Sequence, residues 1–239
     1  MLTDLRWLAL EVKDLDRARA FYADHLDLVP GGSDGGGIPA FARGPGEQVA
    51  LDVGGNPGTD LVLRRPTGLP RGGLHTHYAL SVPAGEYDDW YGRLSASFDL
   101  VEHSFGSVTS LYCYDPDGNC VELAGTGVDG PGVDGVFEVV FEVADLSRAV
   151  GAYEALGFEE VDRQADRVRL TGPVDVELWE PRIGLADARG GVHVDVGFGT
   201  EDPGAAAEAV RGHVRTVEDL DRGYRAWDHD GHAVTFVPA

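Results

Sequence analysis

The first third of the chain alternates between patterns typical of strands and one pattern typical of a helix. Apolar and polar residues alternate over Leu5–Val12, which predicts a strand with one buried face. Asp14 then precedes a segment whose apolar residues recur at helical spacing: Leu15, Ala18, Tyr22 and Leu26. Three strand-like segments separated by Gly and Pro follow: Ile38–Arg43, Gln48–Val53 and Leu61–Arg64. The predicted order is one strand, one helix and three strands.

This order restarts three more times along the chain. EVKDLDRARAFY near the start is repeated as EVADLSRAVGAY, so that Asp145 stands where Asp14 stood. A turn sequence also recurs, as DPDGN in the second repeat and DHDGH in the fourth. The predicted elements of the later repeats are His75–Val82, a helix over Glu86–Phe98, Leu100–Phe105, Val108–Tyr114 and Cys120–Leu123; Val136–Val143, a helix from Asp145, Glu159–Asp162, Arg167–Thr171 and Val174–Glu180; and Val192–Phe198, a helix over Pro203–Gly212, Val214–Val217, Tyr224–Asp228 and Ala233–Val237.

Four repeats of this kind predict an α+β protein with two domains. One repeat cannot bury a curved sheet face by itself, so repeats are expected to pair. The Gly- and Pro-rich stretch Gly125–Gly135 is the best boundary. We expect a first domain at residues 1–126, made of units 1–66 and 73–126. The second domain is expected at residues 134–239, made of units 134–182 and 190–239. These segments are called units 1 to 4 below.

The net charge of the chain limits the kinds of partner that it can bind. The chain has 41 Asp and Glu residues against 19 Lys and Arg residues, a net charge of −22. Such a surface repels nucleic acid and anionic membranes, and the acids are spread along the whole length. No apolar run approaches the roughly 18–20 residues that a bilayer-spanning helix needs. We therefore expect a cytoplasmic protein that binds neither nucleic acid nor membrane.

The acidic, lysine-poor composition also resembles that of proteins from salt-accumulating halophiles. In such cells, concentrated cations screen the repulsion between surface carboxylates. If the protein comes from a halophile, its stability should fall at low salt.

The segment Ser110–Leu123, SLYCYDPDGNCVEL, carries the residues best suited to catalysis or ligand binding. It predicts two short strands joined by a turn, since Pro, Gly and Asn each suit turn conformations. Tyr112 lies on the first strand. Glu122 lies on the second, between apolar neighbours, and is either exposed to solvent or retained for a function. Cys113 and Cys120 are expected to be reduced thiols, because nothing in the sequence marks the chain for export.

The fourfold repeat, DLDRARAFY after the first strand and YCYDPDGNCVEL together resemble the vicinal-oxygen-chelate superfamily. That superfamily contains glyoxalase I, bleomycin-resistance proteins and extradiol ring-cleavage dioxygenases. The resemblance covers nearly the whole chain. It implies curved mixed sheets in which paired units form a cup. Because this fold hosts metal enzymes and metal-free binding proteins alike, the resemblance alone does not choose between them.

The resemblance also implies where metal ligands would lie. In the superfamily they come from the first and last strands of each unit and point into the cup. The first-strand position falls on Trp7, His77, Glu138 and Asp195, and the last-strand position on Val62, Glu122, Glu177 and Thr235. The dioxygenases carry a catalytic tyrosine ten residues before the last-strand glutamate, where Tyr112 stands here. Unit 2 therefore matches an active unit at His77, Tyr112 and Glu122.

Pairing of units 1 and 2 would leave this site one ligand short. Trp7 cannot bind a metal. His77 and Glu122 would therefore supply only two of the three ligands in the two-His-one-carboxylate triad of iron oxygenases. His75, on the same strand face as His77, is the candidate for the missing position. Trp7 is expected to form an apolar wall of the cup and to bind substrate by stacking on a flat molecule.

The second cup would then hold Glu138, Glu177 and Asp195, three carboxylates that repel one another unless a cation lies between them. An alternative pairing stays open. If units 2 and 3 shared a cup, His77 and Glu122 would join Glu138 and Glu177 in a complete glyoxalase-like set, and units 1 and 4 would form a ligand-poor pair.

The resemblance implies a divalent metal that binds two adjacent oxygens of a small-molecule substrate. The metal would be Fe(II) or Mn(II) in a dioxygenase and Zn(II) or Ni(II) in a glyoxalase. The leading hypothesis is an extradiol, catechol-type dioxygenase in which His77 and Glu122 hold the metal and Tyr112 hydrogen-bonds the developing anion. A glyoxalase-like lyase is one alternative. A metal-free binding protein of the bleomycin-resistance type, which would need no cofactor, is another. A homodimer is compatible with all three.

Overall fold

The computed structural model describes residues 1–31, 38, 42, 46–55, 58–66, 76–180 and 194–239. Units 1 and 2 contain β1 (Leu2–Glu11), α1 (Leu15–Leu26), β2 (Val29–Pro30), β3 (Gln48–Asp52) and β4 (Asp60–Arg64), followed by β5 (Thr76–Pro83), the short 3-10 helix η2 (Ala84–Glu86), α2 (Tyr87–Ser95), β6 (Val101–Phe105), β7 (Val108–Tyr114) and β8 (Cys120–Thr126). Units 3 and 4 contain β9 (Val136–Glu142), α3 (Leu146–Ala155), β10 (Glu159–Arg163), β11 (Arg167–Thr171) and β12 (Asp175–Trp179), followed by β13 (Val194–Thr200), α4 (Pro203–Val210), β14 (Thr216–Leu220), β15 (Gly223–Trp227) and β16 (Ala233–Pro238).

The predicted repeat of strand, helix and three strands is confirmed in units 2, 3 and 4. Unit 1 has the same order, but its second strand is Val29–Pro30. Asp14 and Asp145 cap α1 and α3, each accepting a hydrogen bond from a backbone N–H three residues later. Asp202 caps α4 in the same way. In unit 1, most of the strand expected at Ile38–Arg43 lies outside the described residues.

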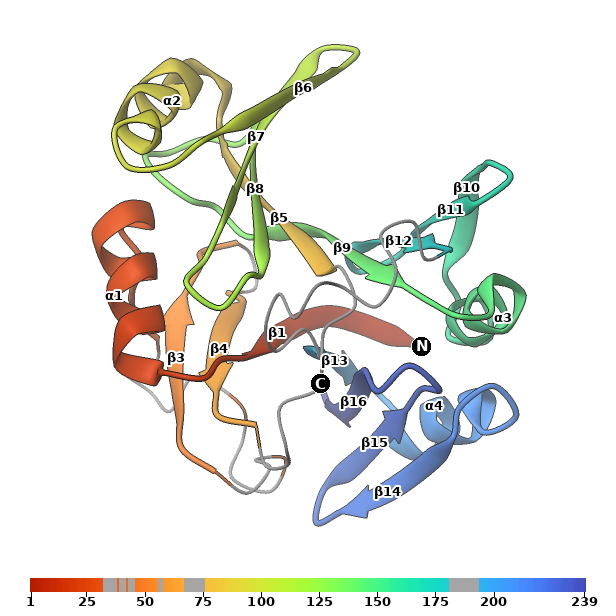
Figure 1. Cartoon of the computed structure of the whole chain (residues 1–239). Helices are drawn as coiled ribbons and strands as arrows, with labels where there is room; N and C mark the ends of the chain where they lie inside the picture. Colours follow the sequence, from red (N-terminus) through yellow and green to blue (C-terminus); the bar gives the residue numbers. More distant parts are fainter. Residues whose placement is uncertain (32–37, 39–41, 43–45, 56–57, 67–75, 181–193) are drawn as a thin grey trace.

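The described strands form two eight-stranded curved mixed sheets (Figure 1). One sheet has the order β2-β3-β4-β1-β13-β16-β15-β14 and is called the 1–4 sheet. The other has the order β6-β7-β8-β5-β9-β12-β11-β10 and is called the 2–3 sheet. In both, the first and last strands of a unit run parallel, and the two units meet through antiparallel first strands, β1 with β13 and β5 with β9. The α+β fold class with cup-forming sheets is therefore confirmed.

The expectation that units 1 and 2 share one cup and units 3 and 4 the other is wrong. Unit 1 shares its sheet with unit 4, and unit 2 shares its sheet with unit 3. Every residue of β13 and the last five residues of β9 are buried, so these first strands suit the centre of an eight-stranded sheet. Such burial would be met by any pairing of first strands. The partner is fixed by the long-range ladders that join β1 to β13 and β5 to β9.

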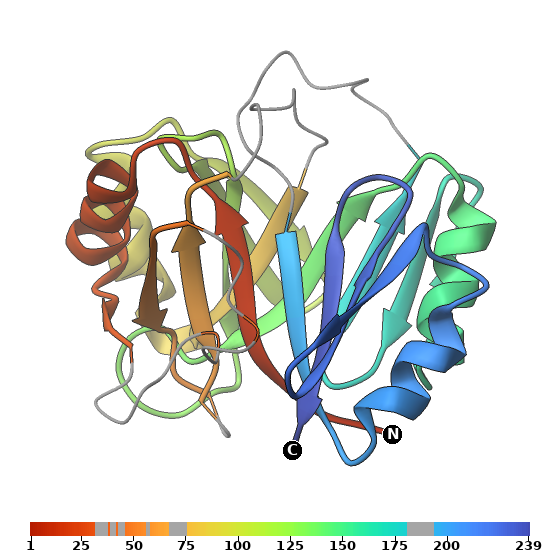
Figure 2. The same ribbon diagram turned by 90° about the horizontal axis from the view of Figure 1, so that it is seen from below.

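Units 1 and 2, and likewise units 3 and 4, contact each other through helices and turns. The helices lie at the two outer flanks of the molecule, α1 near α2 and α3 near α4 (Figures 1 and 2). The repeated turns join the same pairs of units: Asp117 accepts a hydrogen bond from the Lys13 backbone at 2.9 Å, and Asp230 accepts one from the Ala144 backbone at 3.1 Å. The division into residues 1–126 and 134–239 stays a prediction, and each of the two sheets joins one unit from either side of it.

The core follows the apolar pattern of the sequence. The predicted inner face of α1 is buried, and so are the inward residues of the strands against which the helices pack. Cys113 and Cys120 are both buried, and neither forms a disulfide. Among the described residues, no helix combines the length and the apolar character that crossing a bilayer requires.

Candidate metal centre

The strand register at the middle of the 2–3 sheet brings three ligand-type side chains together. Ala79 on β5 pairs with Glu122 on β8 and with Glu138 on β9. His77 lies two residues before Ala79 and therefore on the same face of the sheet. One ligand atom from each of His77, Glu122 and Glu138 lies within 4.8 Å of the others, and all three residues are buried.

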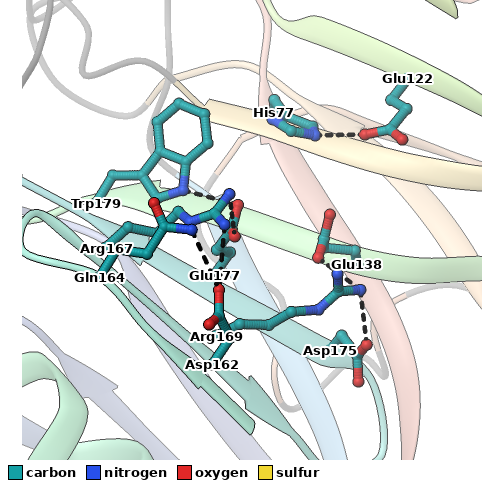
Figure 3. Close-up of polar contacts among 10 residues, drawn as sticks. All are labelled: His77, Glu122, Glu138, Asp162, Gln164, Arg167, Arg169, Asp175, Glu177 and Trp179. Carbon is teal, nitrogen blue, oxygen red and sulfur yellow. Dashed lines mark hydrogen bonds and ion pairs between the residues drawn. The ribbon is translucent and has the colours of Figure 1, made fainter. Parts of the chain in front are cut away.

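His77 and Glu122 form the tightest contact of this group. His77 Nε2 lies 2.6 Å from Glu122 Oε2 (Figure 3). Burial acts to raise the pKa of Glu122, but the hydrogen bond and charge of His77 outweigh it, helped by Ser110 and Tyr112, so the pKa lies below its usual value. The ring of Tyr112 meets His77 edge-on, with centroids 5.4 Å apart. The carboxylate of Glu122 is therefore ionised and ready to bind a cation.

Glu138 faces this pair from the neighbouring unit. Arg169 Nη2 forms an ion pair with Glu138 Oε1 at 3.0 Å, and it also donates to Asp175 Oδ2 at 2.9 Å. Thr171 donates to the other oxygen of Asp175. Burial raises the pKa of Glu138 to about 7, while Arg169 lowers it and the nearby Glu177 raises it. A buried carboxylate with this pKa gains much from a neighbouring cation.

Glu177 is close by but has its own partners. Arg167 Nη1 lies 3.0 Å from Glu177 Oε1, and Trp179 Nε1 donates to Glu177 Oε2 at 2.7 Å. Arg167 Nη2 also lies 3.2 Å from Asp162 Oδ2. Figure 3 shows the Glu177 carboxylate directed toward Arg167 and Trp179. Glu177 does not belong to the group whose ligand atoms converge.

These residues lie in a cavity of about 770 Å³ on the concave face of the 2–3 sheet. One wall is largely apolar and aromatic and comes from β6 and β7: Val101, His103, Phe105, Val108, Tyr112 and Tyr114. The other wall is charged and comes from β10, β11 and β12: Asp162, Arg167, Arg169, Glu177 and Trp179. The volume suits a small organic molecule.

The residues present fit a divalent metal. An imidazole nitrogen and two carboxylates are ligands that Mn(II), Fe(II), Ni(II) and Zn(II) accept. Burying two carboxylates beside each other is costly unless positive charge compensates. His77 and Arg169 supply part of that charge, and a divalent cation between His77, Glu122 and Glu138 would supply the rest.

Of the other predicted site residues, one lines the cavity and two lie in the 1–4 sheet. His75 is outside the described residues. Tyr112 lines the cavity. Trp7 is in the 1–4 sheet, where it is 1% exposed and packs among apolar side chains, so it does not line this cavity. Asp195, also in the 1–4 sheet, is fully buried and lies 3.1 Å from Arg64 and 3.2 Å from Arg225.

The expected second cup with three carboxylates is therefore wrong. Glu138 and Glu177 belong to the 2–3 sheet, whereas Asp195 belongs to the 1–4 sheet. Two arginines and the hydroxyl of Thr235, which donates to Asp195 at 2.6 Å, compensate the aspartate without a metal.

Three residues that line the cavity were not predicted as site residues from the sequence: Arg167, Arg169 and Trp179. A signal was present, because Arg167 and Arg169 alternate with apolar residues and predict a charged face on β11. Their pairing with Trp179 and Glu177 on β12 needs the strand register, which the pattern does not supply.

Comparisons with known proteins support the fold. The chain matches no protein-family model, and no curated protein sequence matches it. A Bacillus subtilis structure described as a candidate dioxygenase is similar, with 17% identity, a TM-score of 0.70, and coverage of 99% of this chain and 85% of that one. Glyoxalase I from maize is similar too, with 19% identity, a TM-score of 0.66, and coverage of 98% and 92%. At such identities the likeness establishes the fold.

Proposed function

We propose that this protein is a metal-dependent enzyme that binds a small molecule through two adjacent oxygens, with chemistry of the glyoxalase type. The observation that carries the proposal is the convergence of His77, Glu122 and Glu138 within 4.8 Å inside a cavity. The likeness in fold to maize glyoxalase I supports the same proposal.

The donor set favours glyoxalase-type over dioxygenase-type chemistry. Among the described residues it consists of one imidazole and two carboxylates. Non-haem iron oxygenases use two imidazoles and one carboxylate. The open alternative of the sequence analysis was a glyoxalase-like set of four residues, His77, Glu122, Glu138 and Glu177. It depends on the pairing of units 2 and 3 that the sheet has, and the first three of these residues form the converging group.

When bound, the metal would polarise the two substrate oxygens as a Lewis acid. His77, Glu122 and Glu138 would hold it from three strands of one sheet. Tyr112 would orient the substrate: burial, followed by the charge of Glu122, raises its pKa, so the phenol keeps its proton and donates a hydrogen bond. Phe105 and the rest of the apolar wall would exclude water from one side of the substrate.

A dioxygenase of the catechol type is the second candidate function. The observation that favours it is Tyr112, which lies ten residues before Glu122 and contacts the ring of His77. In that case the substrate would be a flat diol between the aromatic wall and the metal. The expected cytoplasmic location and homodimer stay predictions.

The test is metal content, measured by elemental analysis on untagged protein purified in molar KCl. We expect near-stoichiometric metal in the wild type and loss of it in His77→Ala, Glu122→Ala and Glu138→Ala. Glu208→Ala, which removes an exposed carboxylate on α4, is the matched control and should keep the metal.

The loaded protein would then be screened against thiol–aldehyde adducts with Ni(II) or Zn(II), and against catechols with Fe(II) in air. Turnover of the adducts supports the proposal, and turnover of catechols supports the second candidate. A wild type that takes up no metal, even from anaerobic Fe(II), would overturn both and leave the metal-free binding protein.

A further inference from the structure

Glu177 occupies the same position in unit 3 that Glu122 occupies in unit 2, yet the two carboxylates have different surroundings. Resting on the metal site proposed above, we propose that Arg167 and Trp179 hold Glu177 out of the metal's ligand set. The metal would then have three protein ligands, His77, Glu122 and Glu138, and would keep open positions for the oxygens of the substrate.

Both oxygens of the Glu177 carboxylate already have partners. Oε1 is ion-paired with Arg167 at 3.0 Å, and Oε2 accepts a hydrogen bond from Trp179 at 2.7 Å. Glu177 is 5% exposed, so both contacts are largely shielded from water. Charge-assisted hydrogen bonds in such a place are among the strong ones, and rotation of the carboxylate toward the metal would break them.

Arg167 and Trp179 are themselves fixed in place by the surrounding structure. Arg167 on β11 pairs with Trp179 on β12 in the strand ladder, so backbone register places both beside Glu177. Asp162 on β10 holds the second nitrogen of the Arg167 guanidinium at 3.2 Å. Trp179 also meets the ring of His77, with centroids 6.2 Å apart. The contacts with Glu177 are therefore built into a rigid wall.

The net charge of the metal and its carboxylate ligands also favours a set without Glu177. Two glutamates balance the charge of a divalent cation, and a third would make the centre anionic. With Glu177 neutralised by Arg167, the metal keeps more of its Lewis acidity and an electron-rich substrate oxygen is not repelled. Arg167 and Trp179 act here as positioning residues, because they affect the metal through Glu177.

The decisive experiment is a calorimetric titration of the full-length apoprotein with Co(II). Glu177→Gln should bind Co(II) within about threefold of the wild-type affinity, because Glu177 is not a ligand. Glu122→Gln and Glu138→Gln should each lose at least about 100-fold, more than the usual effect of a residue outside the ligand set. A loss in Glu177→Gln as large as in Glu122→Gln would overturn the inference.

A second measurement follows the visible spectrum of bound Co(II), whose intensity falls as the coordination number rises. The double variant Arg167→Met with Trp179→Phe should free Glu177, raise the coordination number and weaken the absorption. Adding Glu177→Gln to that variant should restore the wild-type spectrum, which a general loosening of the wall would not do. Arg167→Lys keeps the charge and should stay close to wild type.

Arg211→Met is the matched control, because it removes an exposed arginine from a surface ion pair. An unchanged spectrum in the double variant would contradict the holding role of Arg167 and Trp179. Absence of Co(II) binding in the wild type would contradict the proposed function itself, so the two failures are distinguishable.

Discussion

The indole of Trp7 lies directly against Gly197 at the centre of the 1–4 sheet. A methyl group built on Gly197 would come within 2.0 Å of Trp7 Cε2, so only glycine fits there. Trp7 stands at the strand position that His77 occupies in the 2–3 sheet. The same fold position thus carries a metal-ligand candidate in one cup and an apolar filler in the other.

Gly197→Ala should therefore destabilise the protein. Overpacking of a close-packed core costs about 1–3 kcal/mol, and the clash here is with a rigid ring. Urea denaturation measures the change. Gly92→Ala, an exposed helical glycine with no atom within 4 Å of the added methyl group, is the control and should be neutral or slightly stabilising. In a Trp7→Phe background the cost of Gly197→Ala should shrink; an equal cost there would contradict the proposed clash.

Asp195→Ala should destabilise the fold without weakening metal binding. The substitution would leave Arg64 and Arg225 buried beside each other without their carboxylate, and breaking a buried pair costs about 3–5 kcal/mol. Asp16→Ala, in an exposed pair with Arg19, should change stability by less than about 0.5 kcal/mol. Urea denaturation measures the stability of the variant, and Co(II) titration measures its metal affinity. Lost Co(II) affinity in folded Asp195→Ala protein would show that the two cups depend on each other.

Much of the fold could be predicted from local pattern. Period-2 and period-3.6 stretches recur four times, and the capping residues Asp14 and Asp145 mark helix starts, so each unit could be identified separately. The resemblance to the superfamily, rather than the pattern itself, marked His77 and Glu122 as ligand positions within unit 2.

The pairing of units could not be predicted in this way. The first strands β1, β5, β9 and β13 each carry apolar residues for the core, so hydrophobic pattern makes each an acceptable neighbour for the others. Only the long-range ladder shows that Glu138 pairs with Ala79 and so reaches His77. The partners of Glu177 were hidden for a related reason, because Arg167 and Trp179 come together across strands.

The stability of the protein should carry a pH dependence that originates at Asp115. Burial raises the pKa of this carboxyl above its ordinary value of 3.8, although hydrogen bonds from Asn119 and Tyr22 counteract the shift. The folded state therefore holds the proton at pH values where the unfolded state has released it. The contribution of Asp115 to the free energy of unfolding is fully present below its ordinary pKa. This contribution is lost as pH rises through the pKa of the folded state.

Asp115→Asn removes this titration and some of the hydrogen bonds in the turn. The difference in unfolding free energy between wild type and Asp115→Asn should be largest at acidic pH and should shrink as pH rises. Urea denaturation over a pH series at constant ionic strength measures it, with the exposed Asp16→Asn as the control. A difference that grows with pH would contradict the raised pKa.

Salt should stabilise the protein. With a net charge of −22 the folded state repels itself, and the screening length falls from about 10 Å at 0.1 M salt to about 3 Å at 1 M. We expect the melting temperature to rise by at least about 5 °C between these two KCl concentrations, or about 2 kcal/mol for a chain of this size. An uncharged solute at equal osmolality is the control. An unchanged melting temperature would contradict both this prediction and the halophile-like interpretation of the composition.

Tyr112→Phe should separate metal binding from catalysis. The hydroxyl lies beside Glu122 and lines the cavity, and its raised pKa keeps it a hydrogen-bond donor. We expect the variant to keep wild-type affinity for Co(II) and to lose about 100-fold in kcat, as when one donor to a developing anion is removed. Tyr91→Phe, an exposed tyrosine on α2, should leave both unchanged. Loss of Co(II) binding in Tyr112→Phe would assign the hydroxyl a role in holding Glu122, and full activity would remove Tyr112 from the mechanism.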